Sequence, residues 1–134
     1  MSIIESAVSA IRDRDSRVPE VALILGSGLG SLADSVDNPT VIPGTDIPGY
    51  PQAGVAGHRG DLVIGELDGR VVAFLRGRFH RYEGHDMQTL TLPVRIASGI
   101  GAGRLIVTNA AGSLTKTMPA GSIMRITDHI NTTG

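Results

Sequence analysis

The segment GRFHRYEGH, residues 77–85, concentrates side chains that can do chemistry. It holds two arginines, two histidines, a tyrosine and a glutamate in nine positions. The planar guanidinium of an arginine matches the oxygens of a phosphate group. Arg78, His80 and Tyr82 alternate along the chain, so in an extended segment they point to the same side. The segment therefore predicts a face that binds an anion, with the tyrosine ring beside it to pack against a sugar. A solvated loop of charges is the alternative, which the interleaved Phe79 disfavours.

A second candidate is the glycine-rich segment GSGLG, residues 26–30, which follows the apolar run VALIL. Glycines permit tight, left-handed backbone and leave amide N–H groups open, so such a loop before a helix binds anions. Ser27 adds a hydroxyl donor. The dinucleotide fingerprint G-x-G-x-x-G is not met, because Ser31 stands where its third glycine belongs. A strand-to-helix turn without a ligand remains the alternative.

The third candidate is NAAGS, residues 109–113, which follows the apolar run RLIVT. Small residues at the end of a strand let a ligand lie against the backbone. Asn109 is a residue type that can hold such a loop by hydrogen bonds to its own backbone. For the alanines, close packing of a helix on a strand is an equally good interpretation.

The histidines outside these segments predict no metal site. His58 lies in a glycine-rich stretch, where it is either a donor or lid residue for the anion or simply a solvent-exposed ring. His85, Asp128 and His129 are metal ligands by type, but no pair has the i, i+4 spacing of a zinc site on a helix. There is no G-x-S-x-G motif to indicate a hydrolase serine.

Several elements must position these loops. Apolar periodicity, capping signals and turn residues indicate where these elements begin and end. Ser2 and Glu5 have the spacing of a helix capping box, and Asp68-Gly69 is typical of a hairpin turn. Four prolines predict a loop over 39–60, and Pro93 is expected to kink its helix or limit its first turn. The expected helices cover 2–14, 29–36 and 86–100, and the expected strands 21–25, 61–67, 70–77, 104–112 and 122–130.

Strands that alternate with helices predict an α/β fold with a mixed, largely parallel central sheet flanked by helices. The strands at 104–112 and 122–130 are expected to be buried. In such sheets ligands bind beyond the carboxyl ends of the strands. Each of the three candidate loops follows an apolar strand pattern, so we expect the three to converge on one site.

The composition excludes several classes of protein. The 134 residues carry a formal net charge of −1 without a long basic run, so a nucleic-acid partner is not expected. There is no cysteine, which rules out disulfides, thiolate zinc sites and thiol nucleophiles. No apolar run is long enough to span a bilayer, and the N-terminus lacks the layout of a signal peptide. We therefore expect a cytoplasmic protein without a membrane partner.

In their order and spacing, GSGLG, VAGH, GRFHRYEGH, VTNAAGSL and DHIN resemble the trimeric type of purine nucleoside phosphorylase, from about residue 19 to the last residue. The resemblance implies roles residue by residue. It makes Arg78 and His80 the catalytic pair, Tyr82 a ribose contact, Glu83 a support of the site's geometry together with Asn109, and Ser113 a mild departure where some members have glycine. The residues implied to bind phosphate are Ser27, His58, Arg78, His80 and, through its backbone amide, Ala110.

The reaction implied is phosphorolysis by a pentosyltransferase. Inorganic phosphate attacks C1′ of a purine (deoxy)ribonucleoside and releases the free base and (deoxy)ribose 1-phosphate. No cofactor and no metal is implied, because phosphate is a substrate. The expected partners are inorganic phosphate, the purine nucleoside and two further copies in a homotrimer, or another chain that completes the site.

Family members are longer chains, so residues 1–134 are expected to be the N-terminal part of a single phosphorylase domain. The residues that recognise the purine fall in the part that is absent, and we expect at most weak catalysis from this chain alone. Two alternatives stay open. One is a catalytically weak module that binds phosphate or a sugar phosphate, and the other is a methylthioadenosine phosphorylase, which HRYEGH disfavours. Half of a Rossmann dehydrogenase is more distant, because the glycine spacing is wrong.

Overall fold

The computed structural model describes residues 1–51 and 60–132, which form one five-stranded sheet with helices packed on it. In chain order the elements are α1 (Ile3–Arg12), β1 (Val21–Leu25), the 3-10 helix η1 (Gly30–Asp34), β2 (Asp37–Ile42), the 3-10 helix η2 (Gly44–Asp46), β3 (Leu62–Leu67), β4 (Arg70–Arg76), the 3-10 helix η3 (Arg81–Glu83), α2 (Met87–Gly99) and β5 (Arg104–Val107).

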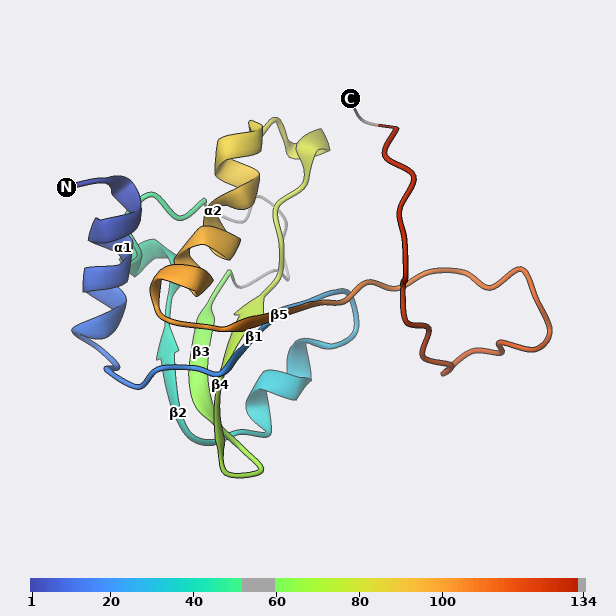
Figure 1. Cartoon of the computed structure of the whole chain (residues 1–134), viewed down its shortest axis with the longest axis horizontal. Coiled ribbons are helices and arrows are strands. Elements are labelled where there is room, and N and C mark those ends of the chain that lie inside the picture. Colours follow the sequence, from blue (N-terminus) through green and yellow to red (C-terminus); the bar gives the residue numbers. More distant parts are fainter. Residues whose placement is uncertain (52–59, 133–134) are drawn as a thin grey trace.

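The strand order β2-β3-β4-β1-β5 sets where the loops lie (Figure 1). β1 is inserted between β4 and β5 and pairs with both in parallel, whereas the β2–β3 and β3–β4 pairs are antiparallel. The prediction of a mixed α/β sheet is confirmed; the parallel pairings are confined to β4-β1-β5, and the other two pairings are antiparallel. Because β4, β1 and β5 run in the same direction, the loops after Leu25, Arg76 and Val107 all leave from the carboxyl ends of the strands, on the same side of the sheet.

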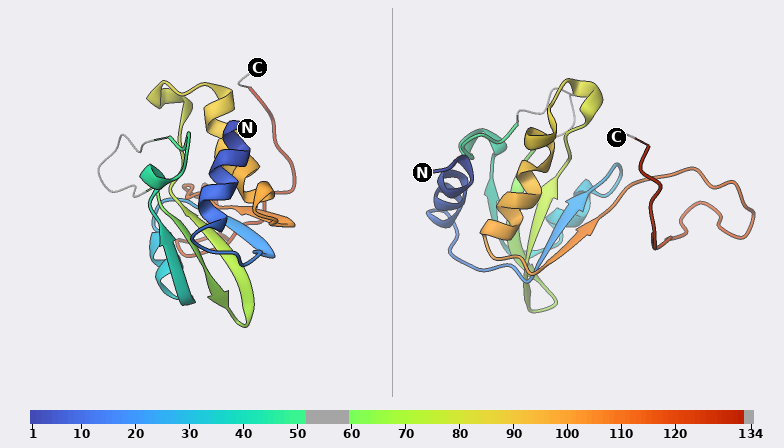
Figure 2. Two further views of the ribbon diagram at one scale, coloured as in Figure 1. Left: turned by 90° about the vertical axis from the view of Figure 1, so that its left-hand side faces the viewer. Right: turned by 45° about the horizontal axis from the view of Figure 1, so that its top comes forward.

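The two faces of the sheet are covered differently. α1 and α2 lie side by side on one face, and η1 lies on the other (Figures 1 and 2). The side chains between the sheet and the two α-helices form the larger core, which includes Ile11, Leu75 and Ile96. A smaller core under η1 includes Ala33 and Phe74. Alternate residues of β4 enter opposite cores, which is the period-2 pattern of a strand that is buried on both faces.

Both α-helices begin at side-chain caps. The Ser2 hydroxyl accepts from the Glu5 amide at 3.2 Å, and the Glu5 carboxylate accepts from the Ser2 amide at 2.6 Å, which confirms the capping box. Asp86 caps α2 by accepting from the Thr89 amide at 2.8 Å. Pro93 lies inside α2, which nevertheless continues to Gly99.

The hairpin predicted at Asp68-Gly69 is confirmed. Both residues have positive φ, 49° and 74°, as a two-residue type I′ turn requires. β3 and β4 then pair in register from Leu67 opposite Arg70 to Leu62 opposite Leu75. This hairpin fixes β4, and so the start of the segment that carries Arg78 and His80.

The loop predicted over 39–60 is wrong at its start, because β2 occupies Asp37–Ile42. Pro39 is tolerated there since β2 is an edge strand, where one missing N–H donor costs little. The register with β3 shifts between Asp37 and Thr40, and Asn38 has a φ of 49°. The irregular pairing thus accommodates the proline that predicted a loop.

The two C-terminal strand predictions need correction. β5 is a strand, but it ends at Val107 and is exposed, and residues 122–130 form no strand. From 109 to 132 the chain is almost entirely exposed and extends away from the sheet (Figure 1). Apolar patterns predict burial only where a neighbour covers them, and β5 has no strand beyond it among the described residues. In the same ranges, no helix combines the length and apolar character needed to cross a bilayer.

Candidate active site

The loops after β1, β4 and β5 meet at the carboxyl ends of these parallel strands. The Gly26 amide donates to the Thr108 hydroxyl at 2.8 Å, and that hydroxyl donates to the Ile24 carbonyl at 3.0 Å. A Cβ on Gly26 would lie 2.6 Å from the Thr108 carbonyl oxygen, 3.0 Å from the Asn109 Cα and 3.1 Å from the Arg78 Nη2. Only glycine therefore fits at position 26. The contact brings one residue of each candidate loop together, as the sequence predicted.

The GSGLG segment forms a turn above this contact. The Leu29 amide donates to the Gly26 carbonyl at 3.2 Å, and Gly28 has a φ of 84°, a conformation that glycine adopts without strain. Ser27 is exposed at the tip of the turn, and η1 begins directly after it at Gly30. The short helix predicted here is present as a 3-10 helix. The turn leaves the Ser27 hydroxyl open to a ligand.

The segment after β4 is anchored by its apolar ring. Phe79 packs against the larger core and makes edge-to-face contacts with Tyr50 and His85, with ring centroids 5.4 Å and 5.7 Å apart. Tyr50 is buried, and this burial raises the pKa of its hydroxyl. Phe79 thus holds the segment against the core, while Arg78 on one side of it reaches Gly26 and His80 on the other reaches Glu83.

The segment from Arg78 to Tyr82 is not extended throughout, as the same-side arrangement of Arg78, His80 and Tyr82 assumed. η3 begins at Arg81, because the Glu83 amide donates to the His80 carbonyl at 3.0 Å and the Glu83 carboxylate accepts from the His80 amide at 3.3 Å. Tyr82 still lies beside His80: the rings stack with centroids 4.7 Å apart and planes 15° apart. The tyrosine is 80% exposed. The proximity of Tyr82 to His80, which alternation along an extended segment predicted, is therefore produced by a helical turn.

Glu83 fixes the imidazole of His80. Its Oε1 lies 3.0 Å from the His80 Nδ1, and this hydrogen bond lowers the pKa of the Glu83 carboxyl. An ionised carboxylate only accepts hydrogen bonds, so the His80 Nδ1 carries the proton and Nε2 faces away from Glu83. The pair leaves Nε2 as the ring atom that can meet a ligand.

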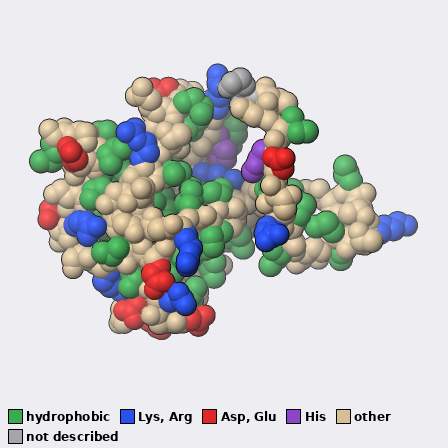
Figure 3. Space-filling model, viewed as in Figure 1, with side chains coloured by type: hydrophobic (Ala, Val, Ile, Leu, Met, Phe, Trp, Pro, Cys, Tyr) green, Lys and Arg blue, Asp and Glu red, His purple; other side chains and the backbone are tan. Residues whose placement is uncertain are grey.

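Asn109 and Ala110 begin the exposed C-terminal segment. The Asn109 side-chain amide donates to the Ala110 carbonyl at 3.3 Å, a hydrogen bond within its own loop. The Asn109 backbone lies against Gly26, while Ala110 is exposed. In the space-filling view, a histidine and basic side chains lie in the hollow between the main body and this segment (Figure 3). His58 lies outside the described residues.

Two features of the site escaped the sequence analysis. Thr108 connects the first and third loops, and its only sequence signal is its place directly after the apolar run of β5. Arg76, at the end of β4, forms an ion pair with Asp34 of η1, and its side chain is 11% exposed. This half-buried arginine, two residues before Arg78, ties η1 to the end of the strand that leads to Arg78.

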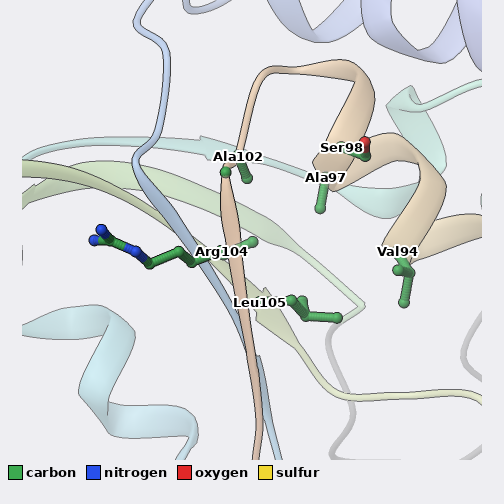
Figure 4. A pocket seen from close by; sticks show the side chains of 8 residues that line it. Val94, Ala97, Ser98, Ala102, Arg104 and Leu105 are labelled. Atoms are coloured by element: carbon green, nitrogen blue, oxygen red, sulfur yellow. The ribbon is translucent and has the colours of Figure 1, made fainter.

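A separate pocket of about 140 Å³ lies between α2 and the start of β5 (Figure 4). It is lined by small and apolar side chains such as Val94, Ala97 and Leu105, and the Arg104 side chain extends away from them. The lining is mostly apolar, with the Ser98 hydroxyl and Arg104 as its polar side chains. Within residues 1–51 and 60–132, no cluster of three or more metal-ligating side chains occurs.

Comparisons with known proteins identify the family. The model of the phosphorylase superfamily matches residues 20–134. Purine nucleoside phosphorylase 1 of Bacillus subtilis (strain 168) is 48% identical over 131 residues, 98% of this chain and 48% of its own. A solved purine nucleoside phosphorylase in complex with ribose-1-phosphate is 44% identical with a TM-score of 0.79, over 87% of this chain and 43% of its own.

A further solved structure, the Schistosoma mansoni purine nucleoside phosphorylase in complex with inosine, is 42% identical with a TM-score of 0.78. The match covers 87% of this chain and 41% of that structure. The chain spans about half the length of the curated relatives it matches. The sequence match, the shared fold and the converging loops agree, and the chain belongs to the phosphorylase superfamily.

Proposed function

We propose that the protein is a purine nucleoside phosphorylase, a pentosyltransferase in which residues 1–134 form the N-terminal part of one α/β domain and supply the phosphate site. The observation that carries the proposal is the meeting of Gly26, Arg78 and Asn109 at the carboxyl ends of three parallel strands. A guanidinium beside an open glycine turn is an arrangement suited to a phosphate dianion. The names of the matched relatives supply the purine nucleoside as the second substrate.

In the proposed reaction, one phosphate oxygen forms a bond to C1′ of the nucleoside. The bond from C1′ to the purine nitrogen breaks, its electron pair leaves with the base, and the base takes up a proton. Positive charge develops on the ribose in the transition state, so a phosphate dianion held close by stabilises it while acting as the nucleophile. No metal or organic cofactor takes part in this scheme.

Each side chain then has a role. Arg78 holds the charge of the phosphate, and His80 and the Ser27 hydroxyl orient its oxygens. The Ala110 amide is a further proposed phosphate donor, and His58 completes the set. Tyr82, stacked on His80, packs against the ribose. The residues proposed to support the geometry are Glu83 and Asn109.

Base recognition and assembly lie outside these residues. Among residues 1–51 and 60–132 we assign no group to the purine, and we propose that a further segment or another chain supplies it, in a homotrimer. The localisation proposed is cytoplasmic, where nucleosides and phosphate are both available.

A second candidate is a module that binds phosphate without turnover. The observation in its favour is that the site is open beside the exposed residues 109–132. Binding and chemistry separate the two candidates, because phosphate binding needs only the three loops and cleavage also needs a purine contact.

The experiment measures phosphate binding by calorimetry and inosine phosphorolysis by a coupled assay, in the wild type and in Arg78→Ala. Loss of one charged donor to the phosphate is expected to lower turnover about 10²–10³-fold. Turnover that falls in the variant supports the enzyme, and binding without turnover supports the module. Phosphate binding that is unchanged in Arg78→Ala would remove this arginine from the site and contradict the proposal.

A further inference from the structure

Arg76, the last residue of β4, lies on the face of the sheet that η1 covers. Side chains alternate along a strand, and Phe74, two residues earlier, belongs to the smaller core under η1. The partner of Arg76 in the parallel register is Leu25 of the same core, the residue directly before the GSGLG segment. Arg76 is thus placed beside the glycine turn without being part of it.

The guanidinium of Arg76 forms an ion pair with the Asp34 carboxylate at the end of η1. The arginine side chain is 11% exposed, and the aspartate side chain is 68% exposed. The Nε of Arg76 is buried and has no hydrogen-bond acceptor among residues 1–51 and 60–132. Within these ranges, Asp34 is the one charged partner of this arginine, and no other ion pair joins η1 to the sheet.

The glycine turn is fixed at its start, where Gly26 packs against the loop after β5. From Ser27 to Gly30 it is exposed, and a Cβ on Gly28 or Gly30 would meet nothing within 4 Å. Glycine loses more conformational freedom than any other residue when it becomes ordered, so an open turn with two glycines is costly to hold in one conformation. The ion pair fixes the helix that follows, and so restrains the turn from its second end.

Resting on the phosphate site proposed above, we infer that Arg76 is a positioning residue, which holds the Ser27 turn in place for phosphate through its ion pair with Asp34. A turn that is already ordered binds its ligand more tightly, because binding then does not include the cost of ordering it. Loss of either partner should therefore weaken phosphate binding. A direct attraction between the Arg76 charge and phosphate predicts a different result, since removal of the negative charge at Asp34 would then strengthen binding.

The test is calorimetric titration with inorganic phosphate in the wild type, Arg76→Gln, Asp34→Asn and the double variant. We expect each single variant to bind phosphate about two- to fivefold more weakly, the range that partly exposed ion pairs reach. The double variant should bind no more weakly than the weaker single variant, because both changes break one contact. Unchanged binding in either single variant, tighter binding in Asp34→Asn, or losses that multiply in the double variant would overturn the inference.

Arg70→Gln is the matched control, because Arg70 lies at the opposite end of β4 and pairs there with Glu20. It also removes one positive charge, and it should bind phosphate as the wild type does. An equal loss in Arg70→Gln would point to net charge and contradict the inference. If Arg76→Gln fails to fold by circular dichroism, Asp34→Asn still decides, with Asp34→Glu expected to restore most of the affinity.

A second measurement separates this inference from the proposed function. Amide hydrogen exchange without phosphate reports on the turn itself, where the Leu29 amide donates to the Gly26 carbonyl at 3.2 Å and the Leu32 amide donates to the Leu29 carbonyl at 3.0 Å. In both single variants these two amides should exchange faster, by a larger factor than the buried Ala73 amide of β4, whose exchange follows general stability. If the wild type binds no phosphate, the proposed function fails, and the exchange rates still decide whether the ion pair holds the turn. Unchanged rates in both variants would sink the inference alone.

Discussion

Within the candidate site, Gly26 has a closely packed environment. The position of its missing Cβ is surrounded by backbone of the Thr108–Asn109 loop and by the guanidinium of Arg78. Backbone atoms cannot move aside as the end of a flexible side chain can. A larger residue there must displace either the β5 loop or the arginine, so stability and anion binding are linked at this position.

We predict that Gly26→Ala lowers the free energy of unfolding by about 1–3 kcal/mol, the usual cost of overpacking, and weakens phosphate binding. The matched control is Gly30→Ala, because a Cβ on Gly30 meets nothing within 4 Å and its φ is not positive. Urea unfolding and phosphate titration measure both variants. Equal losses in the two variants would show that the close approach at Gly26 has no energetic weight.

The ionisation of the Glu83 carboxyl makes the stability of the folded protein depend on pH. Its pKa is lowered, first by the hydrogen bond from the His80 ring, so the ionised form is favoured in the folded protein. The stabilisation is present above the pKa of the unfolded chain, about 4.3 for glutamate, and is lost as the pH falls through the lower folded value.

We predict that the wild type is more stable than Glu83→Gln at pH 6 and that this difference shrinks when the pH is lowered below about 4. Glutamine is neutral at every pH, so the stability of the variant is the baseline against which the wild type is compared. Urea unfolding at several pH values gives the difference in free energy. A difference that stays constant into acid would mean that the His80–Glu83 contact does not depend on the charge of the carboxylate.

At the scale of elements, Arg17 joins the segment between α1 and β1 to the β2–β3 edge. Its guanidinium donates to the Asp15 carboxylate at 2.6 Å, to the Asn38 carbonyl at 2.9 Å and to the Ile64 carbonyl at 3.2 Å. The Asp15 side chain is 4% exposed. Burial raises the pKa of the Asp15 carboxyl, but the bonds from Arg17 outweigh it and lower the pKa overall. The arginine therefore satisfies a buried charge and holds an irregular edge strand.

Arg17→Met is expected to lower the free energy of unfolding by about 2–4 kcal/mol, since it leaves the Asp15 carboxylate buried without its partner. Arg70→Met is the comparison, because the Arg70–Glu20 pair is 63% and 49% exposed and should contribute less than about 1 kcal/mol. Both are measured by urea unfolding. A loss for Arg70→Met that equals the loss for Arg17→Met would contradict this account.

At the scale of the whole molecule, β2 and β5 are the two edge strands of the sheet, and the edge at β5 is the apolar one. β5 exposes Leu105, Ile106 and Val107 at 42%, 48% and 56%, and its outer edge has no partner among the described strands. The segment after it adds Leu114 and Ile123, both almost fully exposed. An open edge with apolar side chains is a template for association with other chains.

We expect this chain in isolation to associate as its concentration rises, and Ile106→Lys to reduce the association by placing a charge on the open edge. Val41→Lys is the control, because Val41 is 49% exposed on β2 at the opposite edge, where its strand neighbours are mostly exposed and polar. Light scattering after size-exclusion chromatography measures the mass. Association that is reduced equally by both substitutions would point to net charge rather than to β5.

Local signals explain which parts of the fold were predictable. The capping box at Ser2 and Glu5, the hairpin at Asp68-Gly69 and the glycine turn at 26–30 each depend on neighbours in sequence, and each was predicted. β2 was missed because Pro39 is a loop signal unless the strand lies at an edge. The buried strand predicted at 122–130 was wrong because an apolar pattern does not say whether anything covers it.

The sequence by itself determined the residue types of the site and the strands from which its loops leave. Only the tertiary structure decided that β1 lies between β4 and β5, which brings Gly26 against Arg78 and Thr108. Strand order is fixed by long-range packing, and no local pattern encodes it. The same holds for His85 and Glu83, whose contact lies beside a 3-10 turn that was not predicted from the sequence.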